Sequence, residues 1–132
     1  MTSLVPITAV YASLLAALVV ILVLLVVKLR RGLKIGIGDG GNRDLARAIR
    51  VHGNATESIP LFLVLLAVSE LKGGHANLLH IFGAIFFIAR VAHASGMLAS
   101  AGASRGRVFG TVGTNGCLLA LAIANLLKAI GG

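Results

Sequence analysis

The sequence predicts an all-α integral membrane protein in which four transmembrane helices form a bundle. The chain of 132 residues is 58% hydrophobic and only 12% charged, with a mean hydropathy of +1.00, a composition typical of membrane proteins. It also contains four apolar stretches that are long enough to cross a bilayer, separated by short polar segments. We therefore expect residues 1–132 to form a single four-helix membrane domain.

The first two helices are expected at about residues 7–29 and 44–71. A helix rises ~1.5 Å per residue, so the first segment is long enough to span a bilayer. The glycine-rich segment 34–42 between them predicts a loop. Asp44 is expected to cap the second helix, with Asn42 as the alternative.

The other two helices are expected at about residues 77–97 and 107–127. The fourth is rich in glycine and alanine. Gly106 and Gly110 form a small-xxx-small pair, which allows neighbouring helices to approach closely.

Some polar residues of the apolar segments have a structural interpretation. Asn115 and Asn125 are expected to form interhelical hydrogen bonds. Tyr11, the single tyrosine of the chain, is expected at the membrane interface, where aromatic side chains concentrate.

The positive charge of the chain is concentrated in two segments. Seven of the 12 basic residues lie between Lys28 and Arg50, and Arg105 and Arg107 lie in the third connection. With four spans both segments are on one side of the membrane, which the positive-inside rule predicts to be the cytoplasm. This placement excludes nucleic acid as the favoured partner and leaves anionic membrane lipid as a second interpretation. We expect a multi-pass protein of a bacterial inner membrane.

A polar stripe marks the beginning of the second helix. Arg43, Arg47, Arg50, Asn54 and Glu57 follow one another at steps of four, three, four and three, which places all five on one helix face. Charged residues inside a membrane helix are costly, so this stripe predicts a functional site.

Residues from the other helices are expected at the same depth. Arg90 and His93 lie near the cytoplasmic end of the third helix. Arg30, Arg31 and Arg107 lie at the same mouth. Polar groups from four helices would then converge on one region, as they do in a binding site.

The residue types in this region restrict its chemistry. Several guanidinium groups favour a ligand with carboxylates, and Glu57 favours a ligand with an amine. No metal is expected, because His52 and His93 have no carboxylate or thiolate partners at metal-ligand spacing. As an alternative, Arg50, Asn54 and Glu57 could form a network that only stabilises helix packing.

The pattern R-x-x-R-x-x-x-N-x-x-E-x-x-P, from Arg47 to Pro60, resembles the signature of the MAPEG family, the membrane-associated proteins in eicosanoid and glutathione metabolism. The pair Arg30-Arg31 and the stretch ARVAH at residues 89–93 support the resemblance. It covers nearly the whole chain in length, hydropathy and motif order.

The resemblance implies a homotrimer that binds glutathione, as a co-substrate, between subunits near the cytoplasmic face. The glutathione-binding residues that it implies are Arg30, Arg47, Arg50, His52, Asn54, Glu57, Arg90 and His93. Arg107 is the best match for the arginine that activates the thiol, with Arg105 as the second choice. Either Arg30 or Arg31 matches an arginine near the acceptor end of the site, and Arg31 is the candidate with a catalytic role.

The function that follows is that of a glutathione-dependent membrane transferase or peroxidase acting on lipophilic electrophiles from the bilayer. A free cysteine thiol has a pKa of ~8.5. An arginine beside the thiol would lower this pKa and so favour the thiolate, which is the nucleophile. Met97 stands where family enzymes often have a tyrosine, which favours a catalytically silent protein that binds glutathione or lipid. A third alternative is a small proton-coupled exporter with Glu57 as the proton carrier.

Overall fold

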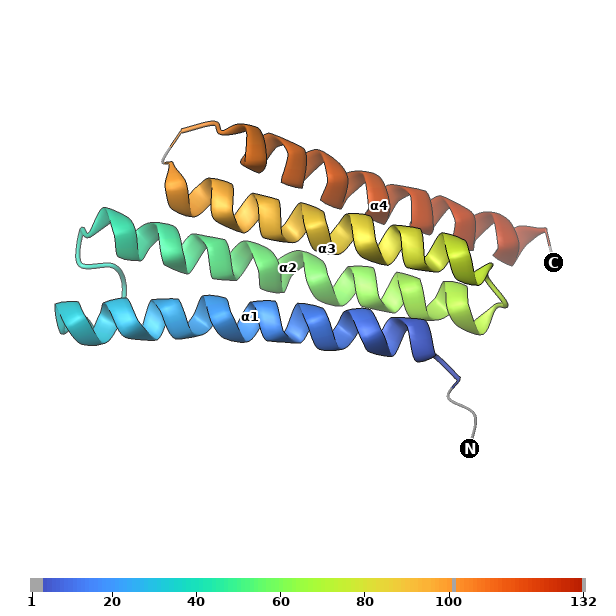
Figure 1. The fold of residues 1–132 in the computed structure, drawn as a ribbon, viewed down its shortest axis with the longest axis horizontal. Coiled ribbons are helices and arrows are strands. Elements are labelled where there is room, and N and C mark those ends of the chain that lie inside the picture. Colours follow the sequence, from blue (N-terminus) through green and yellow to red (C-terminus); the bar gives the residue numbers. More distant parts are fainter. Residues whose placement is uncertain (1–3, 101, 132) are drawn as a thin grey trace.

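The computed structural model describes residues 4–100 and 102–131. In these residues it contains no strand and four α-helices: α1 (Pro6–Leu33), α2 (Arg43–Leu71), α3 (Ala76–Ala99) and α4 (Arg105–Ile130). Each helix is long and apolar enough to cross a membrane. The helices run alternately in opposite directions (Figure 1). The predicted all-α four-helix bundle is confirmed, and no helix end differs from its expected position by more than four residues.

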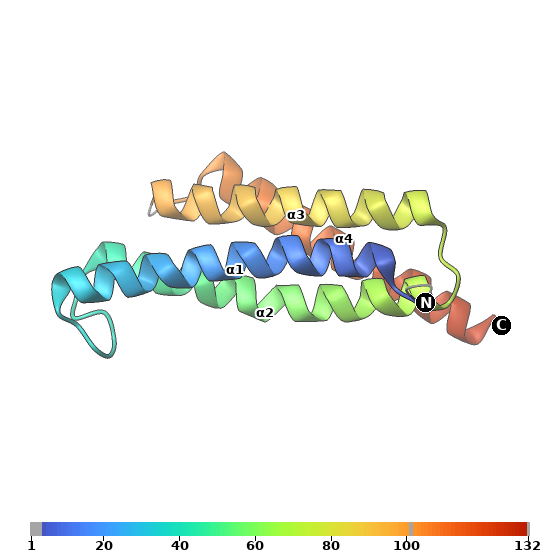
Figure 2. The ribbon, with the colours of Figure 1, turned by 60° about the horizontal axis from the view of Figure 1, so that its bottom comes forward.

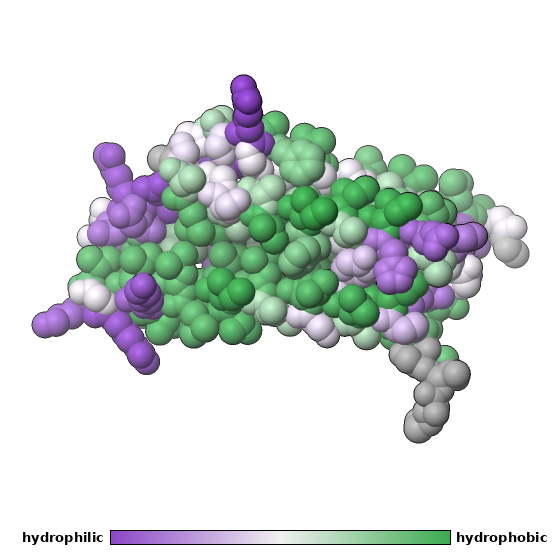
Figure 3. All heavy atoms as spheres, viewed as in Figure 1, coloured by the Kyte–Doolittle hydropathy of each residue, from purple (hydrophilic) through white to green (hydrophobic). Residues whose placement is uncertain are grey.

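The two ends of the bundle differ in charge. The α1–α2 and α3–α4 connections lie at one end, and the α2–α3 turn lies at the other (Figures 1 and 2). Hydrophilic atoms gather at the first end, while the middle of the visible face is apolar (Figure 3). We call the first end the basic end; its cations are Lys28, Arg30, Arg31, Lys34, Arg43, Arg47, Arg105 and Arg107.

The order of packing places α2 and α3 in the centre. In the described part of the chain, α1 contacts α2 and α3 but not α4, and α4 contacts α2 and α3. Figure 1 shows α1 and α4 on opposite sides of the bundle. The backbones of α1 and α4 therefore stay apart in the described part of the chain.

The central helices share the largest side chains of the core. Phe62 of α2 and Phe86 of α3 are fully buried, and their rings stack with centroids 3.7 Å apart and an interplanar angle of 5°. Leu15, Leu66 and Leu121 bring the other buried faces to the same core. Because lipid tails are as apolar as these side chains, the core holds the spans together mainly through van der Waals packing.

Two helix starts differ from the sequence prediction. Asn42, the alternative, caps α2: its side chain accepts hydrogen bonds from the backbone N–H groups of Asp44 and Leu45 at 3.0 and 2.9 Å. Asn42 has the extended backbone that an N-cap needs, whereas Asp44 is already helical. The α4 helix begins at Arg105 and not Arg107, because the Ser104 hydroxyl caps it by accepting from the N–H of Arg107 at 3.2 Å.

The start of α1 is capped by a residue of another helix. Val5 occupies the N-cap position and has no side-chain cap. Instead, the carboxylate of Glu70, near the end of α2, accepts hydrogen bonds from the N–H groups of Ile7 and Thr8, both at 2.8 Å, and from the Thr8 hydroxyl at 2.7 Å. Pro6 has no N–H to satisfy. A carboxylate at this position also interacts favourably with the helix dipole of α1.

The expectation for Tyr11 was wrong. Its side chain is buried between α1 and α3, and its hydroxyl donates to the backbone oxygen of His80 at 2.8 Å. The ring occupies the space left by Gly83, where an added Cβ would lie only 2.2 Å from the ring. A glycine on α3 thus makes room for an aromatic side chain that composition alone assigns to the interface.

Glycines allow α3 and α4 to pack closely, as the small-xxx-small pair predicted. A Cβ on Gly106 would lie 2.9 Å from the backbone oxygen of Ala92. A Cβ on Gly110 would lie 2.4 Å from the Cβ of His93 and 2.6 Å from the backbone oxygen of Ala89. These distances are too short for any side chain, so the two backbones touch here.

The first prediction concerns this close contact. Gly110→Ala should destabilise the bundle by about 1–3 kcal/mol, because the new methyl group forces α3 and α4 apart. Gly116→Ala is the matched control on the same helix, because a Cβ there has no neighbour within 4 Å. It should be neutral or stabilise by up to about 1 kcal/mol. Thermal unfolding in detergent measures both, and equal unfolding temperatures would contradict the close contact.

The second prediction concerns the cap of α1. Glu70→Ala should lower the stability by about 1–2 kcal/mol, because two N–H groups lose their acceptor. Glu70→Gln keeps an oxygen acceptor, so its loss of stability should be less than half of that of Glu70→Ala. Thermal unfolding of the two variants in the same detergent compares them, and an Ala variant as stable as the wild type would show that the cap contributes nothing.

Candidate functional site

A polar cavity lies inside the bundle between α2, α3 and α4. Its volume is about 240 Å³. Its lining residues are Asn54, Glu57, Ser58 and Leu61 of α2, Arg90 and His93 of α3, and Thr111, Thr114, Asn115 and Leu118 of α4. The polar residues of the lining include a cation, a carboxylate and two amides, and Leu61 and Leu118 make its deeper end apolar.

Arg90 is the most unusual residue of the cavity. Only 2% of its surface is exposed. One terminal nitrogen, Nη2, donates to the side-chain oxygen of Asn54 at 2.9 Å, and the other, Nη1, donates to the Thr114 hydroxyl at 3.3 Å. Its Nε is buried without a hydrogen-bond partner, and no carboxylate in residues 4–100 and 102–131 forms an ion pair with it. A buried cation without a counterion is costly, so this guanidinium favours the binding of an anion in the cavity.

His93 completes the environment of Arg90. Its Nδ1 lies 3.2 Å from Nη2 of Arg90. A guanidinium can only donate, so Nδ1 must accept this hydrogen bond. The neutral imidazole therefore carries its proton on Nε2, which remains available as a donor. The backbone of α4 approaches His93 closely, because a Cβ added at Gly110 would lie 2.4 Å from the Cβ of His93.

Glu57 stands at the mouth of the cavity. Its carboxylate accepts from the guanidinium of Arg50 at 3.2 Å, and the two side chains are 60% and 61% exposed, respectively. Arg50 itself does not line this cavity but a separate hollow with Gly38 and Asp39. The pair confirms that the two residues share a face of α2, and it leaves the other carboxylate oxygen of Glu57 without a hydrogen bond in the described part of the chain.

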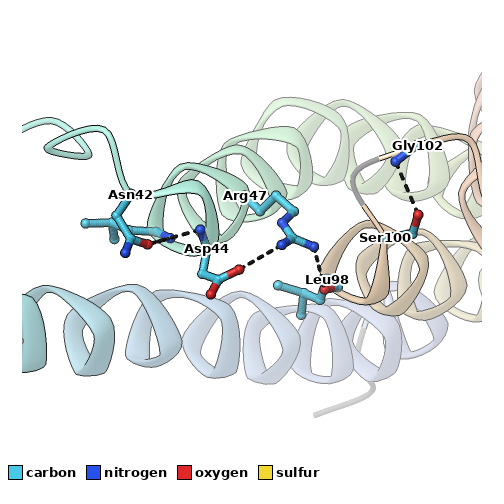
Figure 4. A network of polar contacts seen from close by, with 7 residues as sticks. Asn42, Asp44, Arg47, Leu98, Ser100 and Gly102 are labelled. Carbon is cyan, nitrogen blue, oxygen red and sulfur yellow. Dashed lines mark hydrogen bonds and ion pairs between the residues drawn. The ribbon is translucent and has the colours of Figure 1, made fainter.

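Four of the residues singled out in the sequence meet in this cavity, namely Asn54, Glu57, Arg90 and His93. The others lie elsewhere within one chain. Arg47 pairs with Asp44 at 2.7 Å and donates to the backbone oxygen of Leu98 at 3.3 Å (Figure 4). His52 is half-buried on α2 and outside the lining.

The arginines expected at the mouth are also dispersed. Arg30 donates to the backbone oxygens of Gly38 at 2.8 Å and Ile35 at 3.5 Å, so it holds the α1–α2 loop. Arg31 and Arg105 are exposed. Because α1 does not touch α4, the expected convergence of four helices is reduced to three in a single chain.

Arg107 comes closest to the cavity among these arginines. It lines a neighbouring hollow of α4 with Val108 and Thr111, and Thr111 also lines the cavity. The Thr111 hydroxyl donates to the backbone oxygen of Arg107 at 2.9 Å. The role of Arg107 in activating a thiol stays a prediction, as do the roles of the other arginines.

The sequence analysis missed the contribution of α4. Thr111, Thr114 and Asn115 line the cavity, and Leu118 follows them. Their steps of three, one and three form one helix face, so the polar stripe could have been found by the same periodicity that identified the stripe on α2. Asn115 makes no interhelical hydrogen bond within residues 4–100 and 102–131, contrary to expectation.

Asn125, in contrast, behaves as predicted. Its side-chain oxygen accepts from the Ser69 hydroxyl at 2.9 Å, and its amide nitrogen donates to the backbone oxygen of Leu65 at 2.9 Å. Both bonds join α4 to α2 near the end opposite to the basic end. They stabilise helix packing and take no part in the cavity.

Comparison with known proteins agrees with this architecture. The model of the MAPEG family matches residues 8–127. Among curated proteins the chain is similar to the inner membrane protein YecN of Escherichia coli strain K12 and of Escherichia coli O6:H1 strain CFT073, each 39% identical over 87 residues. These alignments span 66% of this chain and 66% of each relative, just under two thirds of their length. With its four spans, the protein is a multi-pass integral inner membrane protein, and the chain belongs to the MAPEG family.

Proposed function

We propose that the protein is a glutathione-dependent membrane transferase or peroxidase acting on lipophilic electrophiles. The observation that carries the proposal is the buried guanidinium of Arg90, which lacks a carboxylate partner in the described residues and faces a cavity with a carboxylate at its mouth. Membership of the MAPEG family supports it, because proteins of this family are associated with glutathione metabolism.

The donor and acceptor groups of the cavity suit glutathione, which has two carboxylates, one amine and one thiol. Arg90 lines the cavity and offers its guanidinium to a carboxylate, and such charge-assisted bonds are stronger than neutral ones. Glu57 offers a carboxylate to the amine. Asn115 and the Nε2–H of His93 add an amide and a ring donor for the peptide groups.

The thiol end of the ligand would lie toward the basic end, where Arg107 is one helical turn before Thr111. A guanidinium there would stabilise the thiolate, which attacks the electrophile. In conjugation the sulfur–carbon bond forms as the leaving group departs with its electron pair. In reduction the thiolate attacks a peroxide oxygen, the oxygen–oxygen bond breaks, and the other oxygen leaves as an alcohol, which leaves a sulfenic acid on glutathione. A second glutathione thiol then attacks that sulfur, forms the disulfide and releases water.

The size and the exposed mouth of the cavity favour self-association, which is part of the same proposal. The cavity of one chain, about 240 Å³, is below the ~300–1,000 Å³ of typical small-molecule sites. Glu57, Thr111 and Asn115 are exposed around its mouth although they lie within the membrane-spanning helices. Polar groups there are costly when they face lipid. A neighbouring copy, as in the homotrimer that the resemblance implies, would cover this mouth and enlarge the site.

The catalytically silent alternative keeps one specific observation in its favour. Met97, which stands in place of the tyrosine common in family enzymes, is buried in the core and adds no polar group to the cavity. A protein with this cavity could bind glutathione, or an anionic lipid with its chain toward Leu61 and Leu118, without chemistry. Glutathione binding without turnover of any electrophile would identify this alternative.

The third prediction tests the proposed function directly. Purified protein should bind glutathione in calorimetry and conjugate it to a lipophilic electrophile. Arg107→Ala should lower turnover at least tenfold while leaving binding of S-methylglutathione, which has no free thiol, within about threefold, because the residue acts on the thiolate. Glu57→Gln should weaken binding of both ligands at least tenfold, since a charge-assisted hydrogen bond contributes about 1.5–3 kcal/mol and ~1.4 kcal/mol is a factor of ten.

The matched control for Arg107 is Arg43→Ala, which removes an exposed arginine of the basic end that does not line the cavity. It should change neither measurement. Absence of glutathione binding by the wild-type protein would reject both the enzyme and the silent glutathione-binding alternative.

The fourth prediction uses the missing counterion of Arg90. Asn54→Asp places a carboxylate where the amide oxygen now lies, 2.9 Å from Nη2. This internal counterion should raise the unfolding temperature of the ligand-free protein and weaken glutathione binding at least tenfold, because it competes with the ligand for the cation. Asn54→Leu should instead lower the stability by about 1–3 kcal/mol, because it removes a hydrogen-bond partner from a buried charge.

Thermal unfolding and calorimetry on the two Asn54 variants distinguish these effects. If Asn54→Asp destabilised the protein as much as Asn54→Leu does, the guanidinium would not be short of a counterion, and the main support for an anionic ligand would be lost.

A further inference from the structure

A second pocket, mainly apolar, lies beneath the α2–α3 turn, at the end of the bundle opposite the basic end. Its volume is about 110 Å³. The lining that matters here is formed by His75, Leu78 and Phe82 on the α3 side and by Leu121, Ala124 and Lys128 of α4. No residue of this pocket lines the cavity around Arg90, so the two are separate.

The pocket forms where α3 and α4 diverge. Nearer the basic end the two backbones touch, because a Cβ on Gly110 would lie 2.6 Å from the backbone oxygen of Ala89. Figure 2 shows α4 crossing α3 at an angle, so that the helices separate toward the end of α4. The side chains of Leu78, Phe82 and Leu121 line the space between them.

The pocket changes from basic to apolar along its length. On the α3 side its lining runs from His75 to Phe82, and on the antiparallel α4 it runs from Lys128 to Leu121. Seven residues of helix at ~1.5 Å each correspond to a length of ~10 Å. His75 and Lys128 are exposed, whereas Leu121 is buried. The pocket therefore has a basic rim and an apolar floor.

The buried polar side chains in the wall of the pocket are paired inside the protein. The Ser69 hydroxyl donates to the side-chain oxygen of Asn125 at 2.9 Å, and the Asn125 amide donates to the backbone oxygen of Leu65 at 2.9 Å. The interior therefore suits an apolar group. An apolar cavity of ~150 Å³ binds benzene, so a pocket of about 110 Å³ can hold the end of one acyl chain.

The rim of the pocket lacks a counterion. Of the four acidic residues of the chain only Glu70 lies at this end, and its carboxylate accepts from the start of α1 at 2.8 Å. Within residues 4–100 and 102–131 neither Lys128 nor His75 forms a side-chain hydrogen bond or an ion pair. His75 is also the N-cap residue of α3, so an anion beside it would interact favourably with the dipole of this helix.

The pocket is compatible with the proposed homotrimer. A copy that covers the mouth of the cavity around Arg90 would contact Thr111 and Asn115 of α4. Ala124, an exposed residue of the pocket lining, follows Asn115 by nine residues, which is ~2.5 turns of helix. Its side chain therefore lies on the opposite side of α4 from Asn115, away from that contact.

We propose that this pocket binds an anionic phospholipid of the leaflet at this end of the bundle. The phosphate lies between Lys128 and His75, and one acyl chain enters the pocket toward Phe82 and Leu121. The second chain lies outside, against Leu78, which is 55% exposed. The membrane supplies such an anion at this level, because acidic lipids attract basic residues next to a span.

The fifth prediction tests this pocket with matched lysines. Phosphatidylglycerol with a photoactivatable diazirine at the end of one acyl chain is added to delipidated protein in neutral detergent. After illumination, mass spectrometry should find the label near Phe82 and Leu121. Unlabelled phosphatidylglycerol should compete at least fivefold more strongly than phosphatidylcholine. Lys128→Gln should weaken this binding about fivefold, as expected for one basic residue near a membrane surface. Lys72→Gln, an exposed position outside the lining, should change it by less than twofold.

A steric arm tests the pocket itself. Ala124→Phe should fill it and abolish labelling of the floor, whereas Ala120→Phe, at an exposed position of α4 outside the lining, should keep labelling within twofold. Thermal unfolding shows whether both variants are folded. If Ala124→Phe does not fold, the comparison of Lys128→Gln with Lys72→Gln decides alone.

Four outcomes would overturn the proposal. Label found only outside the pocket would show that the chain binds elsewhere. Equal effects of the two lysine variants would mean a diffuse charge effect. Palmitate that competes more strongly than phosphatidylglycerol would identify a free fatty acid as the occupant. A changed number of chains per particle in Ala124→Phe would mean that a second copy contacts the pocket. The assay contains no glutathione, so its outcome does not depend on the proposed function.

Discussion

The burial of the Arg90 guanidinium is the constraint on which the arrangement of α2, α3 and α4 depends. A cation that is 2% exposed inside a membrane helix needs partners from its neighbours. Asn54 of α2 and Thr114 of α4 provide them, and glycines on α4 allow the close approach to α3 that this requires. The charge itself stays uncompensated by any carboxylate of the described residues. The cavity therefore combines closely packed helices with a buried positive charge that lacks a counterion in the described residues.

The missing counterion of Arg90 connects the fold to its proposed chemistry. Removing Arg90 would relieve its desolvation cost, whereas keeping it would stabilise an anionic group of the proposed ligand. Glu57, placed at the mouth, gives the same site an opposite charge for the other end of a zwitterionic ligand. The exposed polar groups around the mouth favour the homotrimer of the proposal, because lipid cannot satisfy them.

The α1 helix serves the fold in a different way. Glu70 caps its beginning, Tyr11 and Leu15 bury its inner face, and Arg30 holds the loop at its end. None of its residues lines the cavity, and its outer face carries apolar residues that end in cations. Within one chain the helix therefore contributes to the fold and not to the lining of the cavity.

The sequence by itself determined the four spans, the side that carries the cations, the family, and the shared faces of Asn54 with Glu57 and of Arg90 with His93. These properties depend on hydropathy and helical periodicity, which are local. Only the tertiary structure decided which faces meet. It separated Arg30 from Arg107 because α1 and α4 do not touch, used Arg47 in a local ion pair, added Thr114 and Asn115 to the cavity, and joined Glu70 to the start of α1. The physical reason is that interhelical packing depends on side-chain volume and close backbone contact, as at Gly83 and Gly110, which no one-dimensional pattern contains.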